Sequence, residues 1–231
     1  MHSNPTSNLS SRRILIVGGS SGIGLALARQ VAQRGAHTIV ASPSAARRAD
    51  ELRAAGLSGN CEFLSFDVTV EREAHRLLER CDSLDHLAVT IKAPLVRAPF
   101  LQLPLEDARR AFEVKFWGQY HLARAAHPRL RPGGSIVLSA GTLASHPHEG
   151  FSIMSAVAGA VESLCKALAL ELAPVRVNAV SPGFTSWQEM DSKIPLGLAK
   201  DAQVANSYLF LMNDRYITGT TVVSDGGATL V

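Results

Sequence analysis

The sequence predicts a single α/β domain built on a doubly wound parallel sheet. Short apolar runs alternate with helical patterns along the whole chain. Uninterrupted apolar strands are typical of a parallel sheet whose two faces are both covered by helices. A glycine-rich segment between the first apolar run and the first helical pattern marks a tight strand-to-helix turn. The chain has 231 residues, 46% of them hydrophobic, and no linker divides it, so one domain accounts for its length.

The first half of the chain predicts four strands. Ile14-Leu15-Ile16-Val17 is expected to be a buried strand, and a helix over 24–34 follows the glycine segment. A strand over 37–41 precedes a helix over 45–55, and a strand over 62–66 precedes a helix over 70–80. The fourth strand covers 86–91. Right-handed crossovers between such strands extend a sheet in two directions.

The second half predicts three more strands, over 135–139, 175–180 and 221–223, with helices over 105–126, 151–172 and 201–212. Proline is expected at element boundaries because it has no backbone N–H to donate. Four prolines fall at such boundaries: Pro104, Pro132, Pro174 and Pro182. In the helix over 151–172, small and aliphatic residues recur on one side, which predicts a packed face.

Composition and charge exclude several classes of function. The net charge is +3 and the basic residues are scattered, so no nucleic-acid-binding surface is expected. No apolar stretch reaches the roughly 20 residues that a membrane span requires. The three cysteines are widely spaced and match neither a metal site nor a disulfide framework, which indicates structural thiols, no metal and a reducing cytoplasm. Residues 1–12 are polar and are expected to form a disordered tail, with the domain over 13–231.

The glycine segment predicts a dinucleotide site. A glycine-rich loop after a strand lets the backbone approach a pyrophosphate, which then rests on the N-terminus of the next helix. The residues expected to contact it are Gly18, Ser20, Ser21, Gly22, Ile23 and Gly24. A tight glycine turn without a ligand is the alternative, but the strand before the loop and the helix after it favour the binding site.

The spacing of three residues between Gly18 and Gly22 resembles that of the short-chain dehydrogenase/reductase family. The similarity extends over nearly the whole chain. It includes Asp67-Val68-Thr69, Gly134-Ser135-Ile136-Val137, Ala160-Val161-Glu162-Ser163-Leu164, Glu171-Leu172-Ala173-Pro174, the segment from Val175 to Gly183, Thr218-Gly219 and Asp225-Gly226-Gly227. The resemblance implies a Rossmann domain and a nicotinamide coenzyme. It places Asp67 and Val68 at the adenine, and Thr90, Pro182, Gly183 and Thr185 toward the nicotinamide.

The end of the second strand predicts NADP rather than NAD. NAD-binding relatives place an acidic residue there to hold the ribose hydroxyls. This chain has Ala41-Ser42-Pro43-Ser44 and no carboxylate until Asp50. Ser42 and Arg47, with Arg48 beside it, are expected to accept a 2′-phosphate. An arginine pair that is only exposed on the next helix is the alternative.

The family's catalytic residues are missing at the matching positions. The resemblance implies a Tyr that donates a proton, a Lys four residues later, a Ser that polarises the carbonyl and an Asn on the preceding helix. An ungapped alignment gives Met154, Ala158, Gly141 and Lys115 there. A shift of the alignment by a few residues does not supply the missing tyrosine, because the chain has no tyrosine between Tyr120 and Tyr208.

Three other polar residues are therefore the candidates for catalysis. Lys115 replaces a residue that faces the cleft in relatives, Ser139 ends the fifth strand, and His148 follows in the next loop. A histidine with a pKa near neutrality suits acid–base chemistry, although an exposed loop residue is the alternative for His148.

Three functions are compatible with this pattern. The first is an NADP-dependent oxidoreductase that transfers hydride to an activated small-molecule acceptor, an imine, iminium or conjugated alkene. The second is an inactive NADP(H)-sensing or partner-binding protein, and the third is a non-redox isomerase or cyclase. The resemblance also implies a homodimer or homotetramer, formed through the helices over 105–126 and 151–172 and the C-terminal segment.

Overall fold

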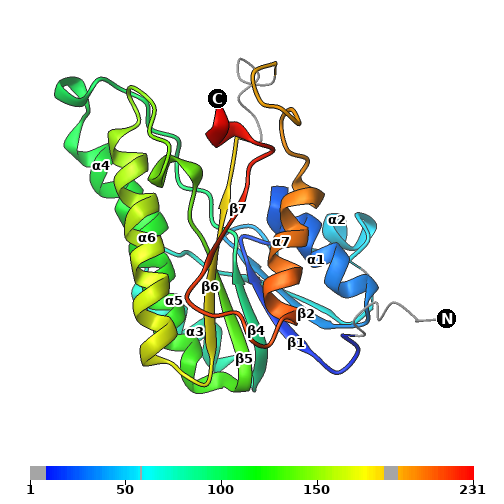
Figure 1. Ribbon diagram of the computed structural model, residues 1–231. Helices are drawn as coiled ribbons and strands as arrows, with labels where there is room; N and C mark the ends of the chain where they lie inside the picture. The colour runs from blue at the N-terminus through cyan, green and yellow to red at the C-terminus, as the bar shows by residue number, and fades with distance from the viewer. Residues whose placement is uncertain (1–8, 58, 185–191) are drawn as a thin grey trace.

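The protein is a three-layer α/β domain around one parallel sheet (Figure 1). The computed structural model describes residues 9–57, 59–184 and 192–231. The strands are β1 (Arg13–Val17), β2 (His37–Ser42), β3 (Cys61–Ser65), β4 (Leu84–Val89), β5 (Leu130–Ser139), β6 (Arg176–Pro182) and β7 (Thr221–Ser224). Their order in the sheet is β3-β2-β1-β4-β5-β6-β7, and every neighbouring pair is parallel. The predicted doubly wound sheet is confirmed.

Helices cover both faces of this sheet (Figure 1). One face carries α1 (Gly22–Gln33), α2 (Ala49–Ala54) and α7 (Asp201–Asn213). The other carries α3 (Glu71–Glu79), α4 (Leu105–Phe112), α5 (Gly118–Ala126) and α6 (Ser152–Glu171). Short 3₁₀ turns lie at Phe100–Gln102, His127–Arg129, Thr142–Ala144 and Ala228–Leu230.

The core consists of two apolar layers, one on each side of the sheet. Successive strand residues point to opposite faces, so Leu15 packs against α3, α5 and α6 while Ile14 and Ile16 pack against α1 and α7. Both faces are therefore buried, which is why the strands are continuously apolar in sequence. Helix α6 is apolar and long enough to cross a membrane by length and composition alone, but its residues Val157 and Val161 are buried in the first of these layers.

Some boundaries differ from the prediction. The helix expected over 105–126 is interrupted by a π-helical turn, Glu113–Trp117, between α4 and α5. Strand β5 begins at Leu130 rather than residue 135, although Pro132 and Gly133 are turn signals, because Leu130 already pairs with Leu84 of β4. Helix α2 begins at Ala49 rather than residue 45, after a series of turns.

The packed chain also begins earlier than the predicted domain boundary at residue 13. Leu9 is buried in the layer against α1, and its N–H donates to the Arg34 carbonyl over 3.1 Å. Arg12 donates to the carboxylate of Asp85 over 2.7 Å. Residues 1–8 of the predicted tail lie outside the described residues.

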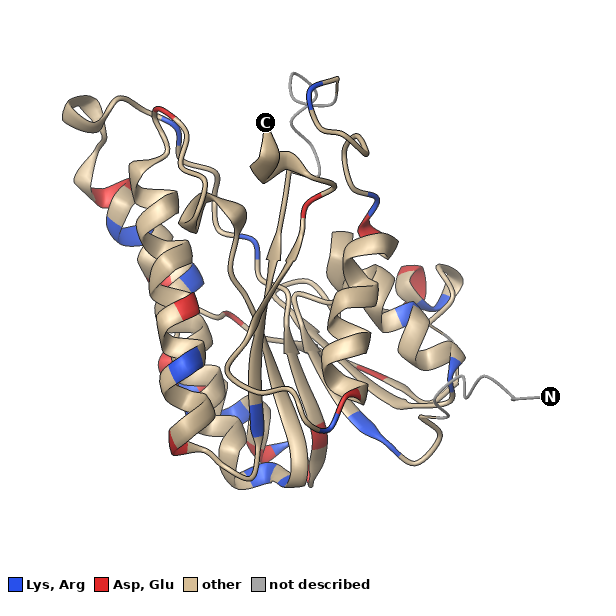
Figure 2. Ribbon diagram, viewed as in Figure 1, with Lys and Arg blue, Asp and Glu red and all other residues tan. Residues whose placement is uncertain are grey.

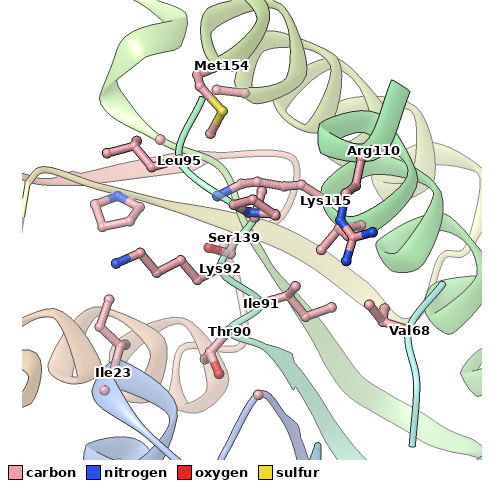
Figure 3. A pocket seen from close by; sticks show the side chains of 18 of the residues that line it. Ile23, Val68, Thr90, Ile91, Lys92, Leu95, Arg110, Lys115, Ser139 and Met154 are labelled. Atoms are coloured by element: carbon pink, nitrogen blue, oxygen red, sulfur yellow. The ribbon is translucent and has the colours of Figure 1, made fainter. Parts of the chain in front are cut away.

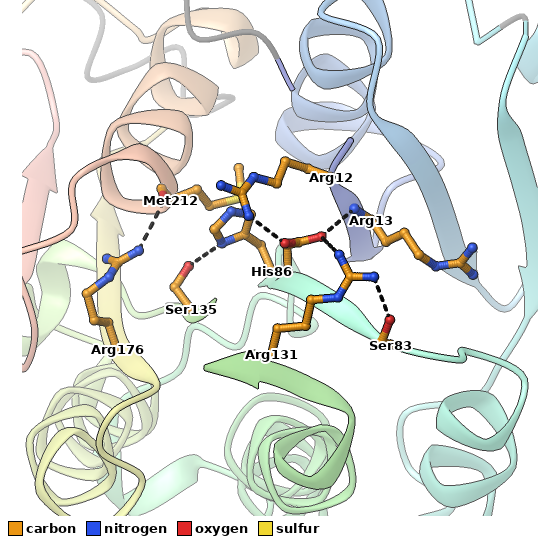
Figure 4. Close-up of polar contacts among 9 residues, drawn as sticks. Arg12, Arg13, Ser83, His86, Arg131, Ser135, Arg176 and Met212 are labelled. Carbon is orange, nitrogen blue, oxygen red and sulfur yellow. Dashed lines mark hydrogen bonds and ion pairs between the residues drawn. The ribbon is translucent and has the colours of Figure 1, made fainter. Parts of the chain in front are cut away.

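A polar network closes the amino edge of the sheet (Figure 4). Asp85 is almost fully buried and accepts hydrogen bonds from Arg12, from the backbone N–H of Arg13 at 2.9 Å and from Arg131 at 3.3 Å. Burial raises the pKa of Asp85, but these hydrogen bonds and the neighbouring guanidinium charges lower it overall. Figure 2 shows basic and acidic residues gathered at this end of the strands. Each buried charge here has its partners, so the edge is structural.

Arg176 makes a separate set of hydrogen bonds at the same end of the sheet, beside α7 (Figure 4). Its guanidinium donates to the carbonyls of Leu211 at 2.8 Å, Met212 at 3.0 Å and Ile217 at 3.3 Å. Carbonyls in the last turn of a helix have no partner within it, and a cation at this end also favours the helix dipole. Arg176 thereby joins the end of α7 to β6.

His86 makes the stability of the protein depend on pH. It is buried beside Asp85 and hydrogen-bonds Ser135 through Nδ1 at 2.8 Å. Burial lowers its pKa to about 4, whereas an unfolded histidine has a pKa of about 6.5. The unfolded chain therefore binds the proton first, and the free energy of unfolding is expected to fall by up to about 3 kcal/mol as pH drops from about 6.5 to 4.

Urea unfolding of the wild type and a His86→Gln variant between pH 7 and pH 4 measures this loss. The variant is expected to lose less stability than the wild type over that range, because it lacks the His86 imidazole. It still loses some, because carboxylates titrate in both proteins. An equal loss in the two proteins would show that His86 does not titrate as expected.

Candidate active site

A cleft of about 1620 Å³ opens at the carboxyl ends of the strands. It is lined by the loops after β1, β2, β3, β4, β5 and β6 and by residues of α4 and α6. The strand order reverses between β1 and β4, and doubly wound sheets bind ligands in the crevice at that reversal. Figure 3 shows part of its lining.

The glycine loop lies against the end of β4. Gly18 and Gly22 have φ values of +84° and +53°, in the left-handed region that side chains rarely adopt. A Cβ at Gly18 would lie 2.8 Å from the Thr90 carbonyl oxygen, and one at Gly24 would collide with Thr90 Oγ1. Thr90 in turn donates through both its N–H and its hydroxyl to the Val17 carbonyl at 2.8 Å. The loop thus brings bare backbone, and the first turn of α1, to the cleft.

Two serines line the far end of the cleft, and an arginine lies beside them. Ser42 donates to the hydroxyl of Ser20 at 2.8 Å, and both are buried. The guanidinium of Arg48 donates to the Ser20 carbonyl at 3.2 Å and makes two bonds to Glu51 at 2.6 and 2.8 Å. Arg47 is exposed and does not line the cleft. The residue of the pair that reaches the loop is therefore Arg48.

A buried glutamine links the π-helical turn to β5. Gln119 donates through Nε2 to the carbonyls of Lys115 at 2.7 Å and Ser139 at 3.1 Å, and its Oε1 accepts the Ser139 N–H at 2.8 Å. A π turn inserts an extra residue into a helix and often lies at a functional site. Gln119 fixes the backbone of this turn, and with it the position from which Lys115 enters the cleft.

Lys115 and Lys92 project into the same cavity (Figure 3). Lys115 is half-buried, and Lys92 follows the end of β4. Burial, followed by the positive charge of Lys92, lowers the pKa of Lys115 to about 8. Both effects disfavour the charged ammonium form.

Apolar side chains line much of the cleft near Lys115, and the cationic side chain of Arg110 lies there too (Figure 3). The apolar lining there includes Ile91, Leu95, Val114, Leu143, Phe151, Met154, Ala158 and Phe184. Ser139 is the hydroxyl at the centre. All three tyrosines lie in the described part of the chain, and none of them lines the cleft. Tyr208 is buried in the layer with α1 and hydrogen-bonds Ser139 and the Val89 carbonyl; burial raises its pKa despite the contact with Ser139.

Comparison with known proteins identifies the family. A family model described as enoyl-(acyl carrier protein) reductase matches residues 17–229. The short-chain dehydrogenase/reductase ucsE from Acremonium sp is 30% identical over 255 residues, covering 96% of this chain and 97% of its own. The chain belongs to the short-chain dehydrogenase/reductase family.

Two solved structures of the family are similar over almost the whole chain. MalC Reductase/Diels-Alderase from Malbranchea aurantiaca has a TM-score of 0.88 and 26% identity, with 98% of this chain and 100% of that chain covered. An NADPH-bound short chain oxidoreductase from Pseudomonas aeruginosa PAO1, described as containing an atypical catalytic center, has a TM-score of 0.87 and 25% identity, with 95% and 97% covered.

Most residues expected to form the coenzyme site of this family member do line the cleft. They are Gly18, Ser20, Ser21, Gly22, Ile23, Ser42, Asp67, Val68, Thr90, Pro182 and Gly183. Gly24 is not among the lining residues and instead packs behind the loop against Thr90. Thr185 lies outside the described residues.

The three catalytic candidates differ in whether they line the cleft. Lys115 and Ser139 line the cleft, whereas His148 does not. The His148 ring packs 5.2 Å from the ring of His146 and 5.8 Å from that of Phe184, so it supports the wall instead of facing the cavity. Gln119 is the residue that the sequence did not reveal, because its three bonds depend on how the π turn meets β5.

Removal of the Gln119 amide is expected to destabilise the protein. A Gln119→Leu substitution leaves the carbonyl of Lys115 and both backbone groups of Ser139 without this partner. The expected loss in free energy of unfolding is about 1–3 kcal/mol, measured by urea denaturation. Gln33→Leu, at an exposed position near the end of α1, is the matched control and is expected to change stability by less than about 0.5 kcal/mol. Equal effects of the two substitutions would contradict the role of Gln119.

Proposed function

We propose that the protein is an NADP(H)-dependent oxidoreductase that transfers hydride to an activated acceptor, an imine, iminium or conjugated alkene. The observation that supports this most is the presence of Met154 and Ala158 in the cleft, at the positions where the family resemblance implies a tyrosine and a lysine. A thioether has no proton to donate and a methyl group cannot hold a ribose. Reduction of a simple ketone needs a proton donor to the developing alkoxide, whereas an activated acceptor already favours hydride addition.

The glycine loop fits the coenzyme. A Cβ at Gly22 would have no atom nearer than the Asp201 carboxylate at 3.8 Å, so the backbone there is open to a ligand, and the N-terminus of α1 is suited to a pyrophosphate. When bound there, the coenzyme supplies the hydride. The residues proposed to hold it are those of the loop, Asp67 and Val68 at the adenine, and Thr90, Pro182, Gly183 and Thr185 toward the nicotinamide.

Two residues are proposed to act on the acceptor. Ser139, whose backbone is held by Gln119 and whose side chain is contacted by Tyr208, is proposed to hydrogen-bond a polar atom of the substrate. Lys115 is a suitable proton donor, since an acid with a pKa of about 8 is largely protonated at neutral pH and releases its proton more readily than an ordinary lysine. His148 has no proposed role, because it does not line the cleft.

The preference for NADP over NAD is supported by the end of β2. Ser42 and Ser44 line the cleft there without a carboxylate, and Arg48 lies beside Ser20. Arginine suits phosphate through planar, charge-assisted hydrogen bonds. The bound NADPH of the similar Pseudomonas oxidoreductase is consistent with this choice.

A non-redox cyclisation is the second candidate. The similar MalC protein is described as both a reductase and a Diels-Alderase, which shows that a related cleft is associated with both kinds of chemistry. In this case the coenzyme would remain unconsumed while the apolar cavity orients the substrate.

The proposed setting is the cytoplasm, with the protein as a homodimer or homotetramer. All three cysteines are free thiols, as expected in a reducing compartment. Exposed apolar side chains on the helices predicted to associate include Trp117 and Leu170.

Deuterium transfer tests the reaction. NADPH carrying deuterium at the hydride position is offered with 1-pyrroline, 2-cyclohexenone or cyclohexanone, and the products are analysed by mass spectrometry. We expect label in the product of the imine or of the enone. Reduction of the ketone is expected to be at least about a hundredfold slower, because the cleft has no tyrosine to protonate the alkoxide. Ketone reduction at the same rate would overturn the proposed mechanism. Binding of NADPH with neither label transfer nor consumption would favour an inactive sensor or the cyclase.

The two neighbouring arginines give a matched test of coenzyme choice. Arg48→Ala is expected to weaken NADPH binding about tenfold, corresponding to about 1.4 kcal/mol, and to leave NADH binding nearly unchanged. Arg47→Ala is expected to leave both affinities unchanged, because Arg47 is exposed whereas Arg48 donates to the Ser20 carbonyl of the glycine loop. Calorimetric titration with each coenzyme measures the change. If only Arg47→Ala weakened NADPH binding, Arg47 would be the arginine that contacts the 2′-phosphate, as predicted from the sequence.

A further inference from the structure

Lys92 and Lys115, hereafter the lysine pair, bring two positive charges to one cavity from separate elements. Lys92 lies in the loop after β4 and Lys115 in the π turn before α5. Both line the cleft, and Figure 3 shows both side chains extending into it with Ser139 between them. The positive charge of Lys92 disfavours the charged form of Lys115.

The lysine pair has no counter-charge within the described part of the chain. No ion pair or hydrogen bond joins either ammonium group to a described residue. Asp67, a carboxylate that lines the cleft, instead accepts from the N–H and hydroxyl of Thr69. The cleft also carries four further carboxylates, and none of them lies within ion-pair distance of either lysine: Glu106, Asp107, Glu113 and Asp201. Three more cations line it as well, Arg97, Arg109 and Arg110. Lys92 is exposed, whereas Lys115 is half-buried, so it is the Lys115 ammonium whose desolvation an anion in the cleft would offset.

The apolar neighbours indicate what the anion is attached to. Met154 and Leu95 lie close to the Lys115 end of the cavity (Figure 3), and Phe151 and Leu143 continue the lining. A ligand that fills this part of the cleft therefore presents a hydrocarbon surface to the wall and negative charge to the amines.

We propose that the lysine pair is an anion subsite that binds the carboxylate of an apolar substrate. The identity of that ligand as the hydride acceptor rests on the proposed function. The inference narrows the acceptor to an imine or conjugated alkene that carries a carboxylate. An acceptor whose only charge is positive is disfavoured, because it would meet two ammonium groups.

The lysine pair is distinct from the expected pyrophosphate position. The glycine loop and the first turn of α1 line one part of the cleft through Gly18, Ser21 and Ile23. Figure 3 shows Lys115 on the opposite side, reaching toward the Met154 end from the helix that bears Arg110. A pyrophosphate at the glycine loop therefore leaves the subsite available, and the titration with NADP⁺ below tests whether the rest of the coenzyme does.

Three probes of nearly equal shape test the subsite by calorimetry. They are trans-cinnamate, the neutral trans-cinnamamide and the cationic trans-cinnamylammonium, titrated into the full chain at low salt with saturating NADP⁺. We expect cinnamate to bind at least about tenfold more tightly than cinnamamide, and cinnamylammonium more weakly than either. Equal affinities for cinnamate and cinnamamide would overturn the proposal. So would loss of cinnamate binding on addition of NADP⁺, which would assign the lysine pair to the coenzyme.

Charge-removing variants locate the effect. Lys92→Met and Lys115→Met preserve most of the side-chain length and are each expected to weaken cinnamate binding about tenfold or more, with cinnamamide unaffected. Lys166→Met is the control, because Lys166 is exposed on α6 and does not line the cleft. An equal loss in the control would mean that the protein's general positive charge attracts cinnamate.

The pH dependence of cinnamate affinity tests the same subsite in the wild-type protein, so it does not depend on whether a variant folds. The Lys115 ammonium is lost as pH rises through its pKa of about 8, so cinnamate affinity is expected to fall between pH 7 and pH 9.5 while that of cinnamamide stays constant. A flat cinnamate profile would contradict the proposal. Cinnamate binding without deuterium transfer to any acceptor would leave the subsite standing and remove the proposed function.

Discussion

The close approach of Thr90 to the glycine loop is the constraint on which the cleft depends. Two hydrogen bonds from Thr90 to the Val17 carbonyl join the ends of β4 and β1, which are the strands on either side of the reversal in strand order. Because Gly18 and Gly24 have no side chains, the loop packs directly on Thr90. Helix α1 then begins at the mouth of the crevice, and the loops after β4 and β5 form its opposite wall. Both the proposed coenzyme site and the lysine pair follow from this arrangement.

The charged side chains at the two ends of the sheet differ in whether they have partners within the described residues. At the amino edge, buried Asp85 is surrounded by arginines and a backbone donor, and Arg176 bonds three carbonyls. Such satisfied groups contribute specificity to the fold. At the carboxyl edge, the described residues offer the lysine pair no counter-charge, and Gln119 fixes only the backbone beside it. A lysine with a lowered pKa in a cleft, such as Lys115, is typical of a functional site.

Sequence alone predicted the fold, and most of the residues that it assigned to the coenzyme line the cleft, because both depend on local patterns. Uninterrupted apolar runs defined the strands, and the glycine spacing placed the loop. The π turn at Glu113–Trp117 escaped prediction, since its sequence has the ordinary periodicity of a helix. The choice between Arg47 and Arg48, and the exclusion of His148 from the cleft, depended on how turns pack in three dimensions. The bonds of Gln119 join segments twenty residues apart, for which no local pattern exists.

Lys115 is the residue on which both proposals depend. As a desolvated cation that faces the cleft, it is suited both to donate a proton and to bind an anion. The most direct measurement is a pH titration of the lysine side chains by NMR, with ¹³C at Cε and the Lys115 resonance assigned from Lys115→Met. The account predicts a midpoint near pH 8 for the free protein and a higher midpoint once cinnamate is bound. A midpoint near the ordinary lysine value of about 10.4, unaffected by cinnamate, would contradict it.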